Sequence, residues 1–177
     1  MNPAGTWSLP VRVEDIPETG RRFDLVANEA IRMALARVAA VNQIPRLEAH
    51  FDVARHGREG LRVAGTISAT VAQTCVVTLE PIETEVAESV DLTFMPGPDS
   101  ARDGATEQIA ASPAREPPEA LIDGTVDLGA IATEFLLLGI DPYPRKTGAV
   151  FAAPPIADDP TAHPFAALAA LKTSKQD

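Results

Sequence analysis

Three consecutive stretches of the chain alternate apolar and polar residues, and this alternation constrains the fold more than any other feature. In the longest, residues 61–79, the odd positions are mostly apolar and the even positions mostly threonine, serine or arginine. Residues 47–53 and 82–94 show the same period of two, which is typical of strands with one buried face. Short turns at 56–60 and 79–81 separate the stretches. The pattern predicts three antiparallel strands in a meander.

Two further features belong to this strand pattern. Residues 61–79 exceed the length of a usual strand, so we expect a bend or bulge near Gly65 or Gln73. A shorter alternation within residues 6–16 predicts an opening strand, which Pro17 ends.

Apolar residues three and four positions apart predict two helices. The first is expected over residues 23–41, and Pro45 prevents its extension. The second is expected over residues 128–138, with Asp127 as its N-cap and Gly139 at its end. The apolar stripe of the first helix consists of Phe23, Ala27, Ile31, Ala34, Leu35 and Val38.

These elements together predict an α+β fold. We expect an antiparallel meander sheet, either open or closed into a barrel, with helix 23–41 covering one face and helix 128–138 alongside. Residues 1–150 are predicted to form a single domain. Residues 96–120 are rich in proline, glycine, alanine, serine and acid, which predicts a mobile acidic loop within it.

Residues 151–177 are predicted to form a flexible, proline-rich tail that ends in a short helix. Pro164 suits the first position of that helix, and Phe165, Leu168 and Leu171 would share one of its faces, followed by Lys172. An apolar stripe on a tail suits contact with a partner.

The charge of the chain is uneven. The net charge is −10 over 177 residues, yet residues 1–62 carry nine arginines against eight acids. The acidic excess therefore lies in residues 63–177, where Glu83, Glu85 and Asp91 share the polar face of one predicted strand. An acidic body repels nucleic-acid phosphates and attracts cationic partners, so a basic protein is the expected contact.

The chain lacks motifs for enzyme chemistry. It has no phosphate-binding glycine loop, and its three histidines lack the spacing of a zinc helix. The single cysteine, Cys75, lies among apolar residues and is interpreted as a buried structural thiol. We therefore expect a cytoplasmic protein that is not an enzyme, with no cofactor, metal, small-molecule substrate or membrane contact.

An RNA-binding surface is the alternative. The arginine-bearing first half of the chain could form a patch that contacts RNA directly, with Arg32, Arg37, Arg55 and Arg58 as its candidate residues. No aromatic stacking residues accompany them, and each has an acid nearby in the sequence.

Three segments, in this order, resemble the bacterial YceD family. They are residues 71–81 (VAQTCVVTLEP), residues 126–138 (VDLGAIATEFLLL) and residues 163–172 (HPFAALAALK), the last matching a closing Pro-Phe-x-x-Leu-x-x-Leu-Lys pattern. Many members carry Cys-x-x-Cys in the first segment, whereas here Thr78 takes the second position. A lone thiolate cannot build a structural zinc site, so metal binding by relatives does not carry over.

The resemblance implies a ribosome-biogenesis factor that supports accumulation of large-subunit (23S) ribosomal RNA. It implies no catalytic residue. With the charge pattern, it leads us to expect contact with a basic large-subunit ribosomal protein or an assembly particle, with ribosomal RNA engaged through that protein. Candidate contact residues are Phe165, Leu168, Leu171, Lys172, Glu83, Glu85 and Asp91.

Overall fold

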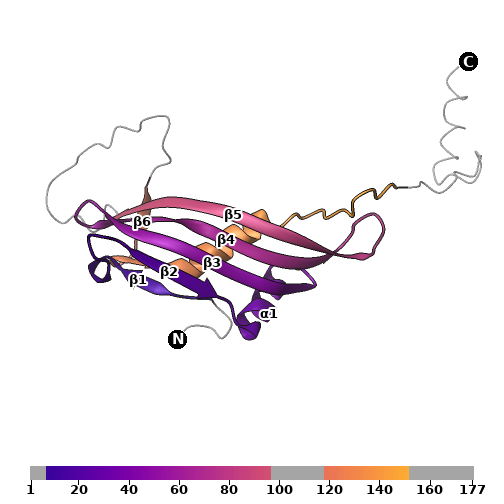
Figure 1. Cartoon of the computed structure of the whole chain (residues 1–177), viewed down its shortest axis with the longest axis horizontal. Helices are drawn as coiled ribbons and strands as arrows, with labels where there is room; N and C mark the ends of the chain where they lie inside the picture. The colour runs from indigo at the N-terminus through magenta and orange to yellow at the C-terminus, as the bar shows by residue number, and fades with distance from the viewer. Residues whose placement is uncertain (1–6, 97–117, 152–177) are drawn as a thin grey trace, which may run out of the picture.

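The computed structural model describes residues 7–96 and 118–151 (Figure 1). Five strands form one sheet in the order β2-β3-β4-β5-β6, and β1 pairs separately with β7. Two α-helices and one short 3₁₀ helix, η1, complete the described part of the chain. The elements are β1 (Pro10–Arg12), η1 (Val13–Asp15), β2 (Arg21–Val26), α1 (Glu29–Val38), β3 (Gln43–His56), β4 (Gly60–Thr74), β5 (Pro81–Pro96), β6 (Glu119–Leu121), β7 (Thr125–Asp127) and α2 (Leu128–Gly139).

The predicted three-strand meander is confirmed. Strands β3, β4 and β5 follow one another in sequence and pair antiparallel, and Gly65 of β4 lies between Phe51 and Val90. The odd positions of β4 supply the core, since Val63, Ile67 and the other large side chains of this set are fully buried. Alternation of polar and apolar residues therefore set both the strand type and the buried face.

The long middle strand differs from the prediction at two points. It ends at Thr74 rather than at residue 79, because Cys75 begins the turn that leads into β5. Pairing is continuous at Gly65, and the register shift lies in β3 between Gln43 and Arg46, opposite the end of β4. Pro45 sits within this irregularity, where a missing backbone N–H disturbs the pairing least.

The predicted helix 23–41 is wrong in its first third. Residues Arg21–Val26 form edge strand β2, in which Phe23 pairs with Phe51, and the helix begins only at Glu29. The Asn28 side chain accepts a hydrogen bond of 2.9 Å from the Ile31 N–H and so caps α1. The helix ends at Val38, which is 69% exposed and so does not belong to the buried stripe.

The second helix follows the prediction. Helix α2 spans Leu128–Gly139 and Asp127 is its N-cap, with hydrogen bonds of 3.0 and 3.1 Å from the Gly129 and Ala130 N–H groups. Gly129 packs directly on the N-terminal segment, since a Cβ there would lie 2.6 Å from the Trp7 carbonyl carbon.

The opening strand is shorter than the predicted residues 6–16. Of the described residues in this range, only β1, Pro10–Arg12, is strand, and it pairs with β7 rather than with the main sheet. The short 3₁₀ helix η1 follows it directly.

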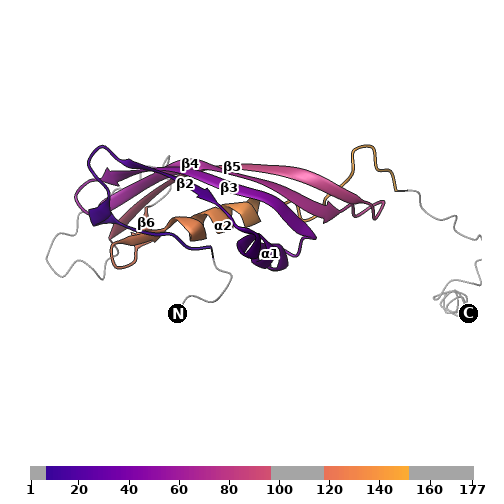
Figure 2. The ribbon, with the colours of Figure 1, turned by 60° about the horizontal axis from the view of Figure 1, so that its bottom comes forward.

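The molecule has two layers, and the predicted α+β class is confirmed. Both helices lie against the same face of the sheet, α1 against β3 and α2 against β4 and β5 (Figure 2). The sheet does not close into a barrel, because β2 and β6 are its two edges. Neither helix lies on the opposite face, which we call the open face.

The expected loop and tail fall largely outside the described residues. Of the predicted loop 96–120, the structure describes only the ends, and there β6 pairs parallel with the last residues of β5, Phe94–Pro96. Residues 119 and 120 are therefore strand rather than loop. The predicted tail helix with Phe165, Leu168, Leu171 and Lys172 lies outside the described residues.

Candidate partner-binding site

The open face is mostly polar. The strand register brings side chains of four strands into rows across it, such as Arg22, Asp52, Ala64 and Asp91. Along its middle, β4 presents small side chains, while charged groups of β2, β3 and β5 flank them.

The arginines of the open face are paired with acids of other strands of the sheet. Arg22 Nε lies 2.9 Å from Asp52 Oδ1, and Arg62 Nη2 lies 2.7 Å from Asp91 Oδ2. Arg46 reaches across β4 to Glu85, at 2.8 Å. These pairs neutralise the bases of the open face and leave it with more acids than bases.

The three candidate acids share one face of β5, with Glu83 and Glu85 adjacent on it and Asp91 further along the strand. Glu83, Glu85 and Asp91 all project onto the open face, as the alternation predicted. Two hydrogen bonds lower the pKa of Glu85 below its ordinary value. The bond from the Thr70 hydroxyl has the larger effect and the bond from Arg46 the smaller. Glu85 and Asp91 thus hold arginines of the sheet, whereas no ion pair joins Glu83 to another residue of the described ranges.

The four candidate arginines for RNA binding are not gathered into one patch. Arg32 and Arg37 belong to α1, beside the start of β3, while Arg55 lies at the other end of that strand and Arg58 in the turn beyond it. The intervening strand rises about 3.3 Å per residue, which separates the two pairs by roughly 25–40 Å. Arg55 also donates to the Ile16 carbonyl at 2.6 Å, so its side chain fastens the N-terminal segment.

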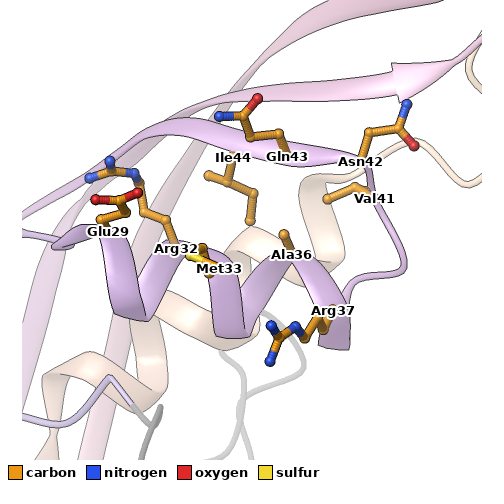
Figure 3. Close-up of a pocket in the computed structure, with 9 residues that line it drawn as sticks. All are labelled: Glu29, Arg32, Met33, Ala36, Arg37, Val41, Asn42, Gln43 and Ile44. Carbon is orange, nitrogen blue, oxygen red and sulfur yellow. The ribbon is translucent and has the colours of Figure 1, made fainter.

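A shallow groove of about 230 Å³ lies between α1 and the start of β3 (Figure 3). Its floor is apolar, with Met33, Val41 and Ile44, and arginines stand at its rim. Arg32 donates to the Ala27 carbonyl at 2.7 Å, which ties it to the start of the helix, and the Arg37 guanidinium points in another direction. The groove therefore lacks converging polar groups that would define a ligand site.

Cys75 is fully buried, as predicted, but it does more than fill space. Its Sγ accepts hydrogen bonds from the Lys146 N–H at 3.3 Å and from the Thr78 N–H at 3.4 Å. These donors, the Lys146 N–H first, lower the pKa of the thiol to about 6, although burial opposes the shift. No sequence pattern could have indicated this, since the donors are backbone groups and Lys146 is remote along the chain.

The turn between β4 and β5, which begins at Cys75 and which we call the Cys75 turn, fastens the segment that follows α2. The Val76 N–H donates to the Pro144 carbonyl at 2.9 Å, and Lys146 Nζ lies 2.9 Å from a Glu80 carboxylate oxygen. The Gln73 side chain donates to the Asp141 carbonyl at 2.8 Å. Thr78, in place of a second cysteine, contributes its backbone N–H to the sulfur, and the arrangement holds two chain segments together.

The described residues contain no cluster of three or more His, Cys, Asp or Glu placed to hold a metal ion. Within those same ranges, no helix is long and apolar enough to span a membrane.

Comparison with known proteins identifies the family. No curated protein and no solved structure matches the chain. One family does match, over residues 63–172, which is more than half of the 177 residues and includes most of β4, all of β5, the Cys75 turn and α2. The chain belongs to the YceD family, whose description is large ribosomal RNA subunit accumulation protein.

Proposed function

We propose that this protein supports accumulation of large-subunit ribosomal RNA by holding a basic ribosomal protein, or an assembly particle that displays one, in the cytoplasm. The family description supports the ribosomal role. The observation that carries the choice of a basic protein is the open face, where β5 presents three carboxylates on one side and the arginines are already paired. Binding of this kind requires no catalytic residue and no cofactor.

Exposed ion pairs would not prevent such a contact. Arg62 and Asp91 keep more than half of their side-chain surface exposed, and so does Glu85. Exposed pairs of this type contribute little to stability, so an incoming lysine or arginine replaces a partner at little cost. Glu83 offers its carboxylate without breaking an ion pair to any of the described residues.

The tail completes the proposal. In this proposal, residues 1–150 form the domain, whose acidic face contacts the partner. The stripe of Phe165, Leu168 and Leu171, with Lys172, adds an apolar contact to that acidic contact. An acidic face and an apolar stripe recognise different parts of a partner, and linking them raises the affinity beyond that of either alone.

A charge reversal tests the acidic face. In a deletion strain complemented with the full chain, Glu83→Arg should fail to restore the large-subunit peak on sedimentation. Glu59→Arg makes the same change of charge on an exposed residue in the turn between β3 and β4, and it should restore the peak. Equal complementation by the two variants would contradict a role for the β5 acids.

A pull-down with the full chain separates protein from RNA as the direct contact. Ribosomal proteins should remain bound after nuclease treatment and be lost with Glu83→Arg. If nuclease releases them, RNA mediates the contact and capture of a basic protein is wrong. A normal large-subunit peak and normal precursor RNA in the deletion strain would overturn the ribosomal role itself.

A further inference from the structure

The outer edge of β5 has no strand beside it, among the described residues, over most of its length. Strand β5 runs from Pro81 to Pro96, and on its inner side it pairs with β4 from Pro81 to Phe94. On its outer side, the only described strand is β6, which pairs with Phe94–Pro96 alone. Residues 81–93 therefore present a long strand edge within the described part of the chain. A free edge of this kind is a template for another strand.

The hydrogen-bond pattern shows which residues direct their backbone groups outward. Bonded and non-bonded pairs alternate along an antiparallel ladder. The Cys75 N–H donates to the Glu80 carbonyl at 2.9 Å, so this pair and every second pair after it are bonded. The even-numbered residues of β5 thus bond to β4, and the odd-numbered residues point their N–H and C=O groups away from it. Between Pro81 and Phe94, the outward set comprises Glu83, Glu85, Ala87, Ser89, Asp91 and Thr93.

The same odd-numbered residues carry their side chains on the open face. No lysine or arginine occurs between Pro81 and Pro96, and three of the six outward residues are acids. The even positions face the helices and are mostly apolar, with Val86 and Val90 buried. The edge is therefore acidic on one side and apolar on the other.

We propose that an extended basic segment of the partner adds to the sheet as a new strand along β5, a deduction that rests on the proposed function. Backbone bonds to the odd residues would supply the pairing, as in other cases of strand addition. Side chains of the added strand alternate between the two faces. Cations at every second position would lie beside Glu83, Glu85 and Asp91, and small apolar residues between them would lie beside Val86 and Val90.

A second copy of this chain does not fit the same edge. Two β5 edges brought together would place carboxylates of one beside those of the other, and like charges on adjacent strands are destabilising. Charge complementarity selects a basic segment instead, because opposite charges on adjacent strands stabilise the pairing.

Hydrogen exchange tests the pairing without any substitution. The probe is a short peptide of alternating lysine and valine, added to the full chain, with amide exchange followed residue by residue by NMR. The N–H groups of Ala87 and Ser89 should exchange freely alone and at least about tenfold more slowly with the peptide, since each would enter a backbone bond. Slower exchange at the edge without peptide, through pairing with another part of the chain or a second copy, would overturn the proposal. Binding without protection at these residues would also overturn it.

A proline substitution tests the edge in the assembly reaction. Ala87→Pro removes an outward N–H while leaving the ladder with β4 intact, and Ala87→Thr fills the same position and keeps the N–H. Peptide affinity should fall about tenfold with proline and stay near wild type with threonine. In the complemented deletion strain, proline should lower the large-subunit peak and threonine should not. If both restore it fully, strand addition is wrong while the ribosomal role stands. If the deletion has no ribosomal defect, the proposed function is what fails.

Discussion

Asp127 is the residue whose loss should most reveal how this fold is held together. Its Oδ1 accepts from the Gly129 and Ala130 N–H groups at the start of α2, and also from the Leu9 N–H at 2.8 Å. Its Oδ2 accepts from the Ser8 hydroxyl at 2.5 Å. One carboxylate therefore caps the helix and fastens the N-terminal segment, two tasks that are distant in sequence.

The cost of Asp127→Ala follows from these bonds. Loss of an N-cap costs about 1 kcal/mol. Loss of a hydrogen bond to a charged acceptor costs about 1.5–3 kcal/mol, because the Leu9 N–H is left without a partner. The sum is about 3 kcal/mol in the free energy of unfolding, measured by urea denaturation with circular dichroism. Asp127→Asn keeps an acceptor and should cost about 1 kcal/mol.

Asn28→Ala is the matched control. Asn28 caps α1 through a single bond to the Ile31 N–H and fastens no second segment of the described chain, so its loss should cost about 1 kcal/mol. The reasoning is refuted if Asp127→Ala costs no more than Asn28→Ala, since the bonds to Ser8 and Leu9 would then contribute nothing.

Two further changes test the turn and the helix contact. The pKa of Cys75 is lowered from 9.0 to about 6, so the thiolate stabilises the folded state fully above pH 9, and this contribution is lost as the pH falls through 6. The melting temperature of the wild-type protein should therefore rise between pH 6 and pH 9 relative to that of Cys75→Ser, which has no thiolate to form. If the melting temperatures of the two proteins change in parallel with pH, no stabilising thiolate forms at Cys75. Gly129→Ala should cost about 1–3 kcal/mol in unfolding free energy, because its Cβ would overlap the Trp7 backbone, whereas Ala130→Ser on the exposed side should be nearly neutral. A neutral Gly129→Ala would show that the N-terminal segment moves aside.

The parts of the fold that depend on side-chain period were predictable from the sequence. Alternation along β3, β4 and β5 indicated the meander and its buried face, and the Asp127 cap marked the start of α2. Both signals are local, because a strand face or a helix cap is set by residues within a few positions.

The region before α1 was not predictable from period alone. Phe23, Ala27 and Ile31 are four apart, as on a helix face, yet Phe23 and Leu25 also alternate as in a strand. Residues 21–26 form a strand rather than a helix because Phe23 pairs with Phe51, which is a contact between distant parts of the chain. Asn28 was the available local sign, since asparagine is a frequent N-cap and separates strand from helix at that point.

In the candidate site, too, some features were predictable from local sequence and others depend on distant contacts. The common face of Glu83, Glu85 and Asp91 followed from strand alternation, but the pairing of the last two with arginines depends on strand order and register. The separation of the α1 arginines from those at the far end of β3 likewise depends on the direction of that strand. Sequence proximity placed these arginines in one half of the chain, and the fold placed them at two ends of a strand.

The distribution of arginine across the sheet explains why the acidic excess is concentrated at β5. Strands β2, β3 and β4 each carry an arginine on the open face, and each of these arginines reaches an acid on another strand. Strand β5 carries no base of its own, and Glu83 has no ion pair among the described residues. The same strand directs backbone groups outward along an edge that, within the described ranges, β6 covers only at its end. Charge and hydrogen-bonding capacity thus coincide at one edge, and a partner that satisfies both must be cationic and extended.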